Sequence, residues 1–193
     1  KKTRGNDKDA VQQLLIIERC LEALREGKPA RRVDISDDDE RLFQMLQLLT
    51  SKPVLYVCNV NEDDAADGNE YTERVATYAD ENGAASIVVS AKIESEVVQL
   101  TDAAERQEFL EALGLEETGL ARLIRAGYQL LGLITYFTAG PKEARAWTIT
   151  TDTKAPQAAG VIHTDFEKGF ICAETIAYDD FVGLGGEVPC KDA

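Results

Sequence analysis

The sequence predicts an α/β protein in which a helical segment precedes the α/β part and a small α+β domain follows it. Two short apolar runs, at 54–58 and 86–89, flank a segment with helical periodicity, which is the pattern of a strand–helix–strand unit. The first 50 residues show two helical patterns, whereas the residues after Gly132 are rich in β-branched and aromatic side chains. A chain of 193 residues is long enough for one large domain or two small ones.

The helical segment is predicted to contain two helices. The first covers residues 9–26 and ends at Gly27, and the second begins after Ser36, where a run of acidic residues favours a capping-box-like helix N-terminus. The first helix repeats apolar side chains at three- and four-residue spacing, at Val11, Leu14, Ile17, Leu21 and Leu24. The second is expected to place on one face Leu42, Phe43, Met45, Leu46 and Leu49.

Residues 51–131 are predicted to form the strand–helix–strand unit and two further helices. The runs at 54–58 and 86–89 are continuous and apolar, which is typical of strands buried on both faces. The predicted helices cover 70–82, a segment ending at Gly114 and a segment ending at Gly132.

Residues 132–193 are predicted to form the small α+β domain. The β-rich runs 133–138 and 144–150 favour a hairpin, a short helix follows over 156–162, and a third strand is expected at 170–173.

Charge is distributed unevenly along the chain. The net charge is −14, yet residues 1–32 carry nine Lys and Arg against five Asp and Glu. A basic end on an acidic body is typical of an arm that contacts nucleic acid, and a solvated helix face is the alternative. The acidic body is expected to avoid casual contact with nucleic acid, and we expect no DNA partner. The apolar runs are too short to span a membrane, so we expect no membrane partner.

The four cysteines form no metal-binding pattern. They are scattered without a C-x-x-C pair, and the chain has a single histidine, which argues against a zinc site. We expect reduced core thiols in a cytosolic protein. Redox regulation of the protein through Cys58 is one functional hypothesis, and it is weaker than the two that are given below.

Polar clusters follow both apolar runs of the strand–helix–strand unit. Residues 59–62 read Asn-Val-Asn-Glu and residues 90–92 read Ser-Ala-Lys. Ligands of open α/β sheets bind beyond the carboxyl ends of the strands, so the two clusters are expected to converge on one ligand site.

These two clusters resemble the base-recognition half of a GTPase-type P-loop domain. The usual first motif is Asn-Lys-x-Asp, and here Val60 replaces the Lys and Glu62 replaces the Asp. This variant resembles the YchF, or Obg-like ATPase, family, as do the flanking sequences at 52–56 and 62–64. By this resemblance residues 1–50 are part of an antiparallel coiled-coil arm, 51–131 are the C-terminal half of the nucleotide-binding domain, and 132–193 are a TGS domain, a ubiquitin-like β-grasp.

The resemblance implies a cytoplasmic, ribosome-associated enzyme that binds and hydrolyses ATP in preference to GTP, with Mg²⁺. The implied base-binding residues are Asn59, Val60, Glu62, Ser90, Ala91 and Lys92. Contacts to the ribosome or ribosomal RNA are expected at Lys28, Arg31, Arg32 and His163. The second hypothesis is a non-catalytic ribosome- or RNA-binding module whose shape is set by nucleotide.

The chemistry of the bases agrees with the first hypothesis. A carboxylate suits guanine, which offers two adjacent donors, whereas an amide such as that of Asn59 suits the N6/N7 edge of adenine. The longer Glu62 weakens the guanine contact, and the stem of Lys92 can cover a base with its charge near the ribose and phosphates. The alternative for Asn59 is a cap of the strand end.

The motifs for phosphate binding are not found in this sequence. The spacing of Gly114 and Gly119 fits a P-loop, but Leu120 stands where Lys is required. The D-x-x-G match at 180–183 lies in the β-rich domain and is interpreted as coincidental. We therefore expect the phosphate-binding loop and Mg²⁺ ligands to precede Lys1, the TGS strands to be cut short after Cys190, and residues 1–193 to hold no catalytic residue.

Overall fold

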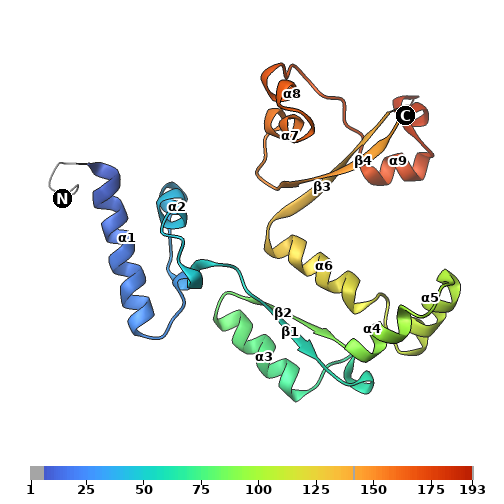
Figure 1. The fold of residues 1–193 in the computed structure, drawn as a ribbon, viewed down its shortest axis with the longest axis horizontal. Coiled ribbons are helices and arrows are strands. Elements are labelled where there is room, and N and C mark those ends of the chain that lie inside the picture. The colour runs from blue at the N-terminus through green and yellow to red at the C-terminus, as the bar shows by residue number, and fades with distance from the viewer. Residues whose placement is uncertain (1–6, 141, 193) are drawn as a thin grey trace. The chain divides into compact units, whose positions relative to one another are not determined.

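The computed structural model describes residues 7–140 and 142–192 and divides the chain into two compact units (Figure 1). The first unit spans residues 1–132 and the second spans 133–193. Each unit is described by itself.

The helical segment packs around a small core of its own. Helix α1 covers Lys8–Arg25 and α2 covers Asp37–Gln44, with 3₁₀ turns at Ala30–Arg32 and Leu49–Ser51. The core contains Ile16, Cys20, Ala30, Leu42 and Phe43. Burial of these apolar groups joins the two helices and the first turn into one body.

The predicted second helix is shorter than expected. It ends at Gln44, and Gln47 adopts a positive φ of 48°, which a continuing helix does not allow. Leu49 is therefore not on a shared apolar face and is 86% exposed. Ser36 is the N-cap as predicted, but its hydroxyl donates to the Asp39 carboxylate instead of capping a backbone N–H.

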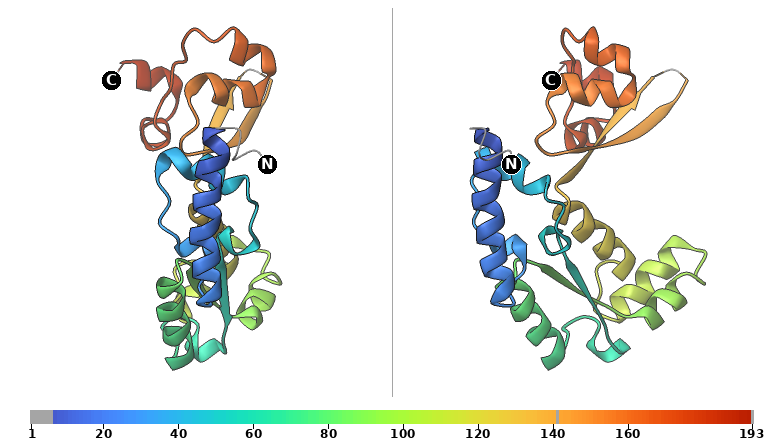
Figure 2. Two further views of the ribbon diagram at one scale, coloured as in Figure 1. Left: turned by 90° about the vertical axis from the view of Figure 1, so that its left-hand side faces the viewer. Right: turned by 60° about the vertical axis from the view of Figure 1, so that its left-hand side comes forward.

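The α/β part of the first unit is a parallel strand pair between helices. Strands β1 (Leu55–Asn59) and β2 (Ala85–Val89) pair in register from Leu55↔Ala85 to Asn59↔Val89. Figures 1 and 2 show α3 (Glu70–Glu81) and α6 (Gly119–Leu130) on opposite faces of this pair. The strand–helix–strand prediction is confirmed.

The prediction that both strands are fully buried is wrong. Every residue of β2 is only partly buried, and Val57 of β1 is 48% exposed. The reason is that one helix covers each face of a two-stranded sheet, and β1 has no second neighbour among the strands that the structure describes.

A second core lies beyond the carboxyl ends of β1 and β2. Two helices build it, α4 over Ala91–Val97 and α5 over Ala103–Ala112. The sequence analysis did not predict α4. The buried side chains of this core are Ala65, Ile93, Val97, Leu110 and Leu115.

Among its described residues, the second unit contains the predicted hairpin and four short helices. Strands β3 (Leu133–Ala139) and β4 (Ala144–Thr150) are antiparallel. The helices are α7 Ala155–Ile162, α8 Thr164–Lys168, α9 Tyr178–Leu184 and α10 Glu187–Asp192.

The third strand expected at 170–173 is not formed. These residues have no regular structure, and Ile171 is 92% exposed. A strand needs a neighbour to satisfy its backbone groups, and β3 and β4 pair only with each other among the described residues.

Candidate functional site

The two polar motifs meet at one edge of the strand pair. Asn59 and Val89 are partners at the carboxyl ends of β1 and β2, and the Val60 N–H donates to the Val89 carbonyl at 2.9 Å. Because the strands are parallel and in register, the residues that follow them leave the sheet side by side. The structure thus brings residues 59–62 and 90–92 together.

Asn59 joins the first motif to the second. Its side-chain Oδ1 accepts a hydrogen bond from the Ala91 N–H at 2.9 Å. This donor fixes the orientation of the amide, so that Nδ2 is the remaining donor group. Asn59 is exposed, and its Nδ2 makes no hydrogen bond to the part of the chain that the structure describes.

Glu62 and Lys92 form a second link between the motifs. The Lys92 ammonium lies 2.5 Å from Glu62 Oε2. The hydrogen bond and the negative charge of Glu62 raise the pKa of Lys92, and Glu96 and Asp63 add smaller contributions in the same direction. Lys92 therefore stays protonated and points to a carboxylate of its own chain, whereas the sequence analysis expected its charge near ribose and phosphates.

Ser90 is the buried residue of the second motif. It is the N-cap residue of α4 and is only 2% exposed. Its hydroxyl is buried and has no hydrogen-bond partner among residues 7–140 and 142–192. Buried hydroxyls in proteins are almost always paired, so this group is a candidate for contact with a ligand or with a rearranged loop.

Glu94 is a functional candidate that the sequence analysis missed. Its two carboxylate oxygens accept the N–H groups of Gly119 at 2.6 Å and Leu120 at 3.1 Å. These N–H groups begin α6, which is where Gly114 and Gly119 imitate P-loop spacing. Because Glu94 already caps them, they are not available to a phosphate, in agreement with the absence of a P-loop lysine.

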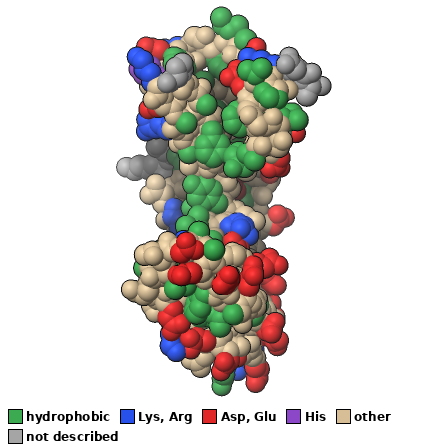
Figure 3. Space-filling view, turned by 90° about the vertical axis from the view of Figure 1, so that its right-hand side faces the viewer, with side chains coloured by type: hydrophobic (Ala, Val, Ile, Leu, Met, Phe, Trp, Pro, Cys, Tyr) green, Lys and Arg blue, Asp and Glu red, His purple; other side chains and the backbone are tan. Residues whose placement is uncertain are grey.

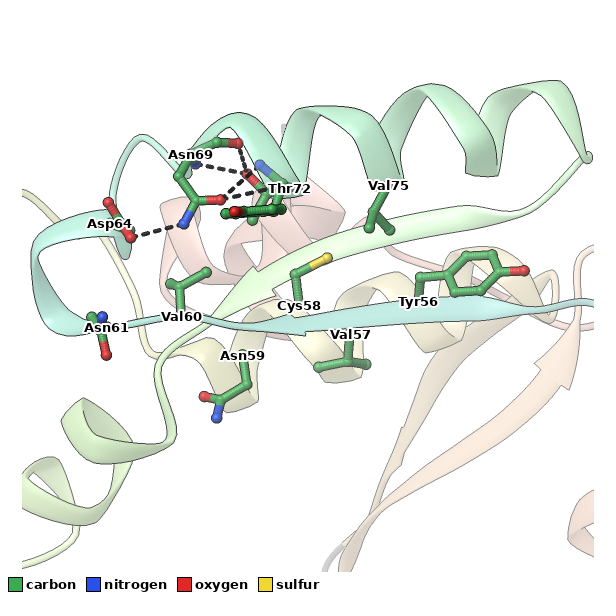
Figure 4. A pocket seen from close by; sticks show the side chains of 11 residues that line it. Tyr56, Val57, Cys58, Asn59, Val60, Asn61, Asp64, Asn69, Thr72 and Val75 are labelled. Atoms are coloured by element: carbon green, nitrogen blue, oxygen red, sulfur yellow. Dashed lines mark hydrogen bonds between the residues drawn. The ribbon is translucent and has the colours of Figure 1, made fainter.

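A groove of about 720 Å³ runs along β1. Figure 4 shows Cys58 and Val60 on the side of β1 that faces α3, and Asn59 on the opposite side. Asn69 caps α3 there and donates to the Asp64 carboxylate at 2.8 Å. Of the six expected base-binding residues, only Asn59 and Val60 line this groove, so the groove and the paired motifs are separate features.

The expected ribosome-contact residues are largely engaged within the chain. Lys28 pairs with Glu26 at 2.7 Å. Arg31 donates to the carbonyls of Asn82 at 2.8 Å and Thr50 at 3.4 Å, and thereby ties the helical segment to the end of α3. Arg32 is exposed. The basic residues Lys1, Lys2 and Arg4 lie outside the described residues.

In the second unit, His163 acts as a local cap. Its Nδ1 accepts the Asp165 N–H at 3.2 Å at the start of α8. The Arg145 guanidinium lies 4.1 Å from the centre of the Trp147 ring, so the two residues share one face of β4. The D-x-x-G match lies inside α9 and not in a loop, which agrees with its interpretation as coincidental.

The cysteines differ from the expected set of core thiols. All four are free, but only Cys20 is buried, while Cys172 is exposed.

Within residues 7–140 and 142–192, no three His, Cys, Asp or Glu side chains are grouped so that they could hold a metal ion. In the same residues no helix is long and apolar enough to cross a membrane. Figure 3 shows acidic side chains gathered over α4 and α5 in the lower part of the view, a surface that repels nucleic acid.

Comparison with known proteins gives consistent matches over the whole chain. The ribosome-binding ATPase YchF of Bacillus subtilis is 51% identical over 195 residues, which cover 100% of this chain and 53% of that protein. The YchF of Escherichia coli O157:H7 is 49% identical, with the same coverage. Obg-like ATPase 1 of Rattus norvegicus is 40% identical over 98% of this chain and 49% of that protein.

Two further findings concern the domain and the fold. The sequence model of a family named YchF-GTPase_C, described as a protein of unknown function (DUF933), matches residues 133–193. The structure of the Schizosaccharomyces pombe YchF GTPase aligns with a TM-score of 0.79 and 38% identity over 92% of this chain and 48% of that one. The chain spans about half the length of the curated relatives it matches. On this combined evidence, the chain belongs to the YchF, or Obg-like ATPase, family.

Proposed function

We propose that this chain carries the nucleobase-recognition half of a ribosome-associated P-loop NTPase that prefers ATP. The observation that supports this most directly is the hydrogen bond from the Ala91 N–H to Asn59 Oδ1, which joins the two motifs at one sheet edge. It leaves Asn59 Nδ2 without a hydrogen bond to the described residues. An oriented amide with a free donor suits the N7 acceptor of adenine, and the second lone pair of Oδ1 suits the N6 donor. The B. subtilis, E. coli and rat relatives are named ATPases, whereas the S. pombe structure is titled a GTPase.

The expected base edge consists of the two motifs together. Asn59 faces the base, and Val60 and Ala91 supply apolar surface and backbone beside it. Glu62 and Lys92 close the edge through their ion pair. Ser90 supplies a buried hydroxyl.

Phosphate chemistry is assigned elsewhere in the complete protein. Mg²⁺ would neutralise charge on the nucleotide phosphates when bound, and positioning supplies most of phosphoryl-transfer catalysis. We assign no nucleophile, general base or Mg²⁺ ligand to residues 1–193. A preparation of these residues alone is expected to show no ATP turnover, and measurable turnover that survives further purification contradicts this assignment.

The ribosome is the proposed macromolecular partner, and a cytoplasmic location follows from that partner. Support comes from the names of the bacterial relatives and from the net positive charge of residues 1–32. The proposed division into an arm (1–50), half of a nucleotide-binding domain (51–131) and a TGS domain (132–193) assigns this contact to the arm and the TGS domain. The second candidate remains a non-catalytic ribosome-binding module, which ribosome co-sedimentation unaffected by nucleotide would favour.

Calorimetric titration of the complete protein with ATP and GTP tests the base edge. Asn59→Ala is expected to weaken ATP binding by about 1–3 kcal/mol, the magnitude of one good base contact. Gln99→Ala is the control, since Gln99 is an exposed amide side chain outside both motifs. Equal ATP affinity of the parent and Asn59→Ala would remove Asn59 from the site.

A further inference from the structure

The ion pair between Glu62 and Lys92 connects two motifs that are 30 residues apart in the sequence. Lys92 is 66% exposed and Glu62 is 32% exposed, so the pair lies at the surface where a base would approach. Among the described residues, Glu62 records no other ion pair, and Lys92 has only this hydrogen bond from its ammonium.

Both partners are held in place by the same core. Lys92 is in the first turn of α4, whose next residue Ile93 is 1% exposed. Glu62 begins the 3₁₀ turn Glu62–Asp64, which Ala65 follows. Ala65 is also 1% exposed, and Ala65 and Ile93 belong to one apolar cluster. The backbone on both sides of the pair is therefore anchored, and the contact needs little ordering of the chain when it forms.

The ion pair occupies the Glu62 carboxylate, which is the group that guanine requires. Guanine presents two adjacent donors on its Watson–Crick edge, and a carboxylate is the side chain that accepts both. Here Oε2 of that carboxylate already accepts from an ammonium. Guanine also presents the O6 acceptor, and the Ala91 N–H that could donate to it is taken by Asn59. Adenine requires neither group, because its N6 donor and N7 acceptor match the amide of Asn59.

We propose that Lys92 determines nucleobase specificity by pairing with Glu62 and so withholding this carboxylate from guanine. This inference rests on the proposed function, since it concerns the choice of base at the same edge. It gives Lys92 a role directed at Glu62 instead of at the nucleotide phosphates. The surrounding charges favour the same arrangement, because Glu96 and Asp63 also attract the Lys92 ammonium.

The test measures ATP and GTP affinities of the complete protein by calorimetry. Lys92→Met is expected to raise GTP affinity relative to ATP about two- to fivefold, the range of a partly exposed ion pair. Lys92→Arg keeps the cation and is expected to keep the parent ratio. Lys92→Met combined with Glu62→Gln is expected to lose the gain, because guanine then finds no carboxylate. Lys52→Met, at an exposed lysine before β1, removes the same charge and controls for net charge.

The outcomes separate this inference from the proposed function. A parent protein that binds ATP, with an unchanged or lower GTP-to-ATP ratio in Lys92→Met, overturns the role of Lys92 alone. Failure of the parent to bind ATP overturns the proposed function.

A measurement without nucleotide tests the ion pair itself. In residues 1–193, Glu62→Gln is expected to lower the pKa of Lys92 in an NMR titration of the lysine side chains, and Asp67→Asn, at an exposed acid of the same loop, serves as its charge control. An unchanged pKa of Lys92 in Glu62→Gln overturns the pair in solution, and with it the inference.

Discussion

The carboxylate of Glu94 caps the helix that begins at Gly119, 25 residues later in the chain. Oε1 accepts the Gly119 N–H at 2.6 Å, and Oε2 accepts the next N–H of the same helix at 3.1 Å. Gly119 is buried, and a Cβ there would lie 2.9 Å from Glu94 Oε1 and 3.2 Å from the side chain of Val89. The close approach thus depends on glycine, and it joins the start of α6 to α4, the helix that carries Lys92.

Replacement of Glu94 by Ala is expected to destabilise residues 1–193 by about 1–2 kcal/mol. Two N–H groups at the start of α6 lose an anionic acceptor, and caps of this kind contribute about this amount. Urea unfolding followed by circular dichroism measures the change. Glu108→Ala, at an exposed position of α5, is the control and is expected to stay within about 0.5 kcal/mol of the parent. Equal midpoints for the two variants would contradict the capping role.

Ser90→Ala is expected to affect folding stability and ATP binding differently. The buried Ser90 hydroxyl has no partner among the described residues, so its removal should leave stability unchanged or raise it by up to about 1 kcal/mol. If the hydroxyl contacts the nucleotide, or residues 59–62 when nucleotide is bound, ATP affinity should fall in the same variant. Thermal unfolding and calorimetry on one preparation test both effects. A large loss of stability would show that the hydroxyl is paired in the folded chain.

The arm cations are expected to act unequally in ribosome binding. Lys28→Glu with Arg32→Glu should weaken co-sedimentation and lower the slope of log affinity against log salt by about two units, one for each lost phosphate contact. ATP affinity should not change, since neither residue lies at the base edge. Lys52→Glu, at an exposed lysine outside the proposed arm and TGS domain, is the control.

Arg31 is expected to behave differently from its two neighbours. It bonds to the Asn82 and Thr50 carbonyls, so Arg31→Glu should lower the unfolding midpoint as well. Co-sedimentation of the Lys28/Arg32 double variant that equals the parent at about 0.15 M salt would favour the TGS surface as the contact.

Cys20 is expected to react with thiol reagents more slowly than Cys172. Burial raises the pKa of the Cys20 thiol, and Cys172 is exposed. Since the thiolate is the reactive form, Ellman's reagent at pH 8 should label Cys172 first and Cys20 only on unfolding. Single Cys→Ser variants at the two positions assign each phase, and a fast phase that disappears in Cys20→Ser would contradict the burial of this thiol.

The raised pKa of Cys20 also predicts the direction in which folding stability changes with pH. The folded state holds this proton more tightly than the unfolded state, so the contribution to stability is complete below the unfolded pKa of about 8.5. It declines as pH rises through the folded pKa. The loss of stability between pH 8 and 10 should therefore be smaller in Cys20→Ser than in the parent.

Local patterns in the sequence were sufficient for most elements of the fold. Periodic apolar residues and glycine stops predicted α1, α3 and α6, and two apolar runs predicted β1 and β2, because these signals arise from neighbours in the chain. The convergence of residues 59–62 and 90–92 also followed from the sequence, since parallel strands bring their carboxyl ends to one edge. The same reasoning failed at 170–173, where β propensity without a neighbouring strand produced no strand.

Only the tertiary structure decided how the side chains at the edge where the two motifs meet are used. The sequence by itself determined which residues reach that edge, because motif order and strand direction are properties of the chain. It could not determine that Lys92 meets Glu62, that Glu94 caps α6, or that Arg31 ties the helical segment to α3. These contacts join residues 25 to 51 positions apart, and their geometry depends on how separate elements pack around shared cores.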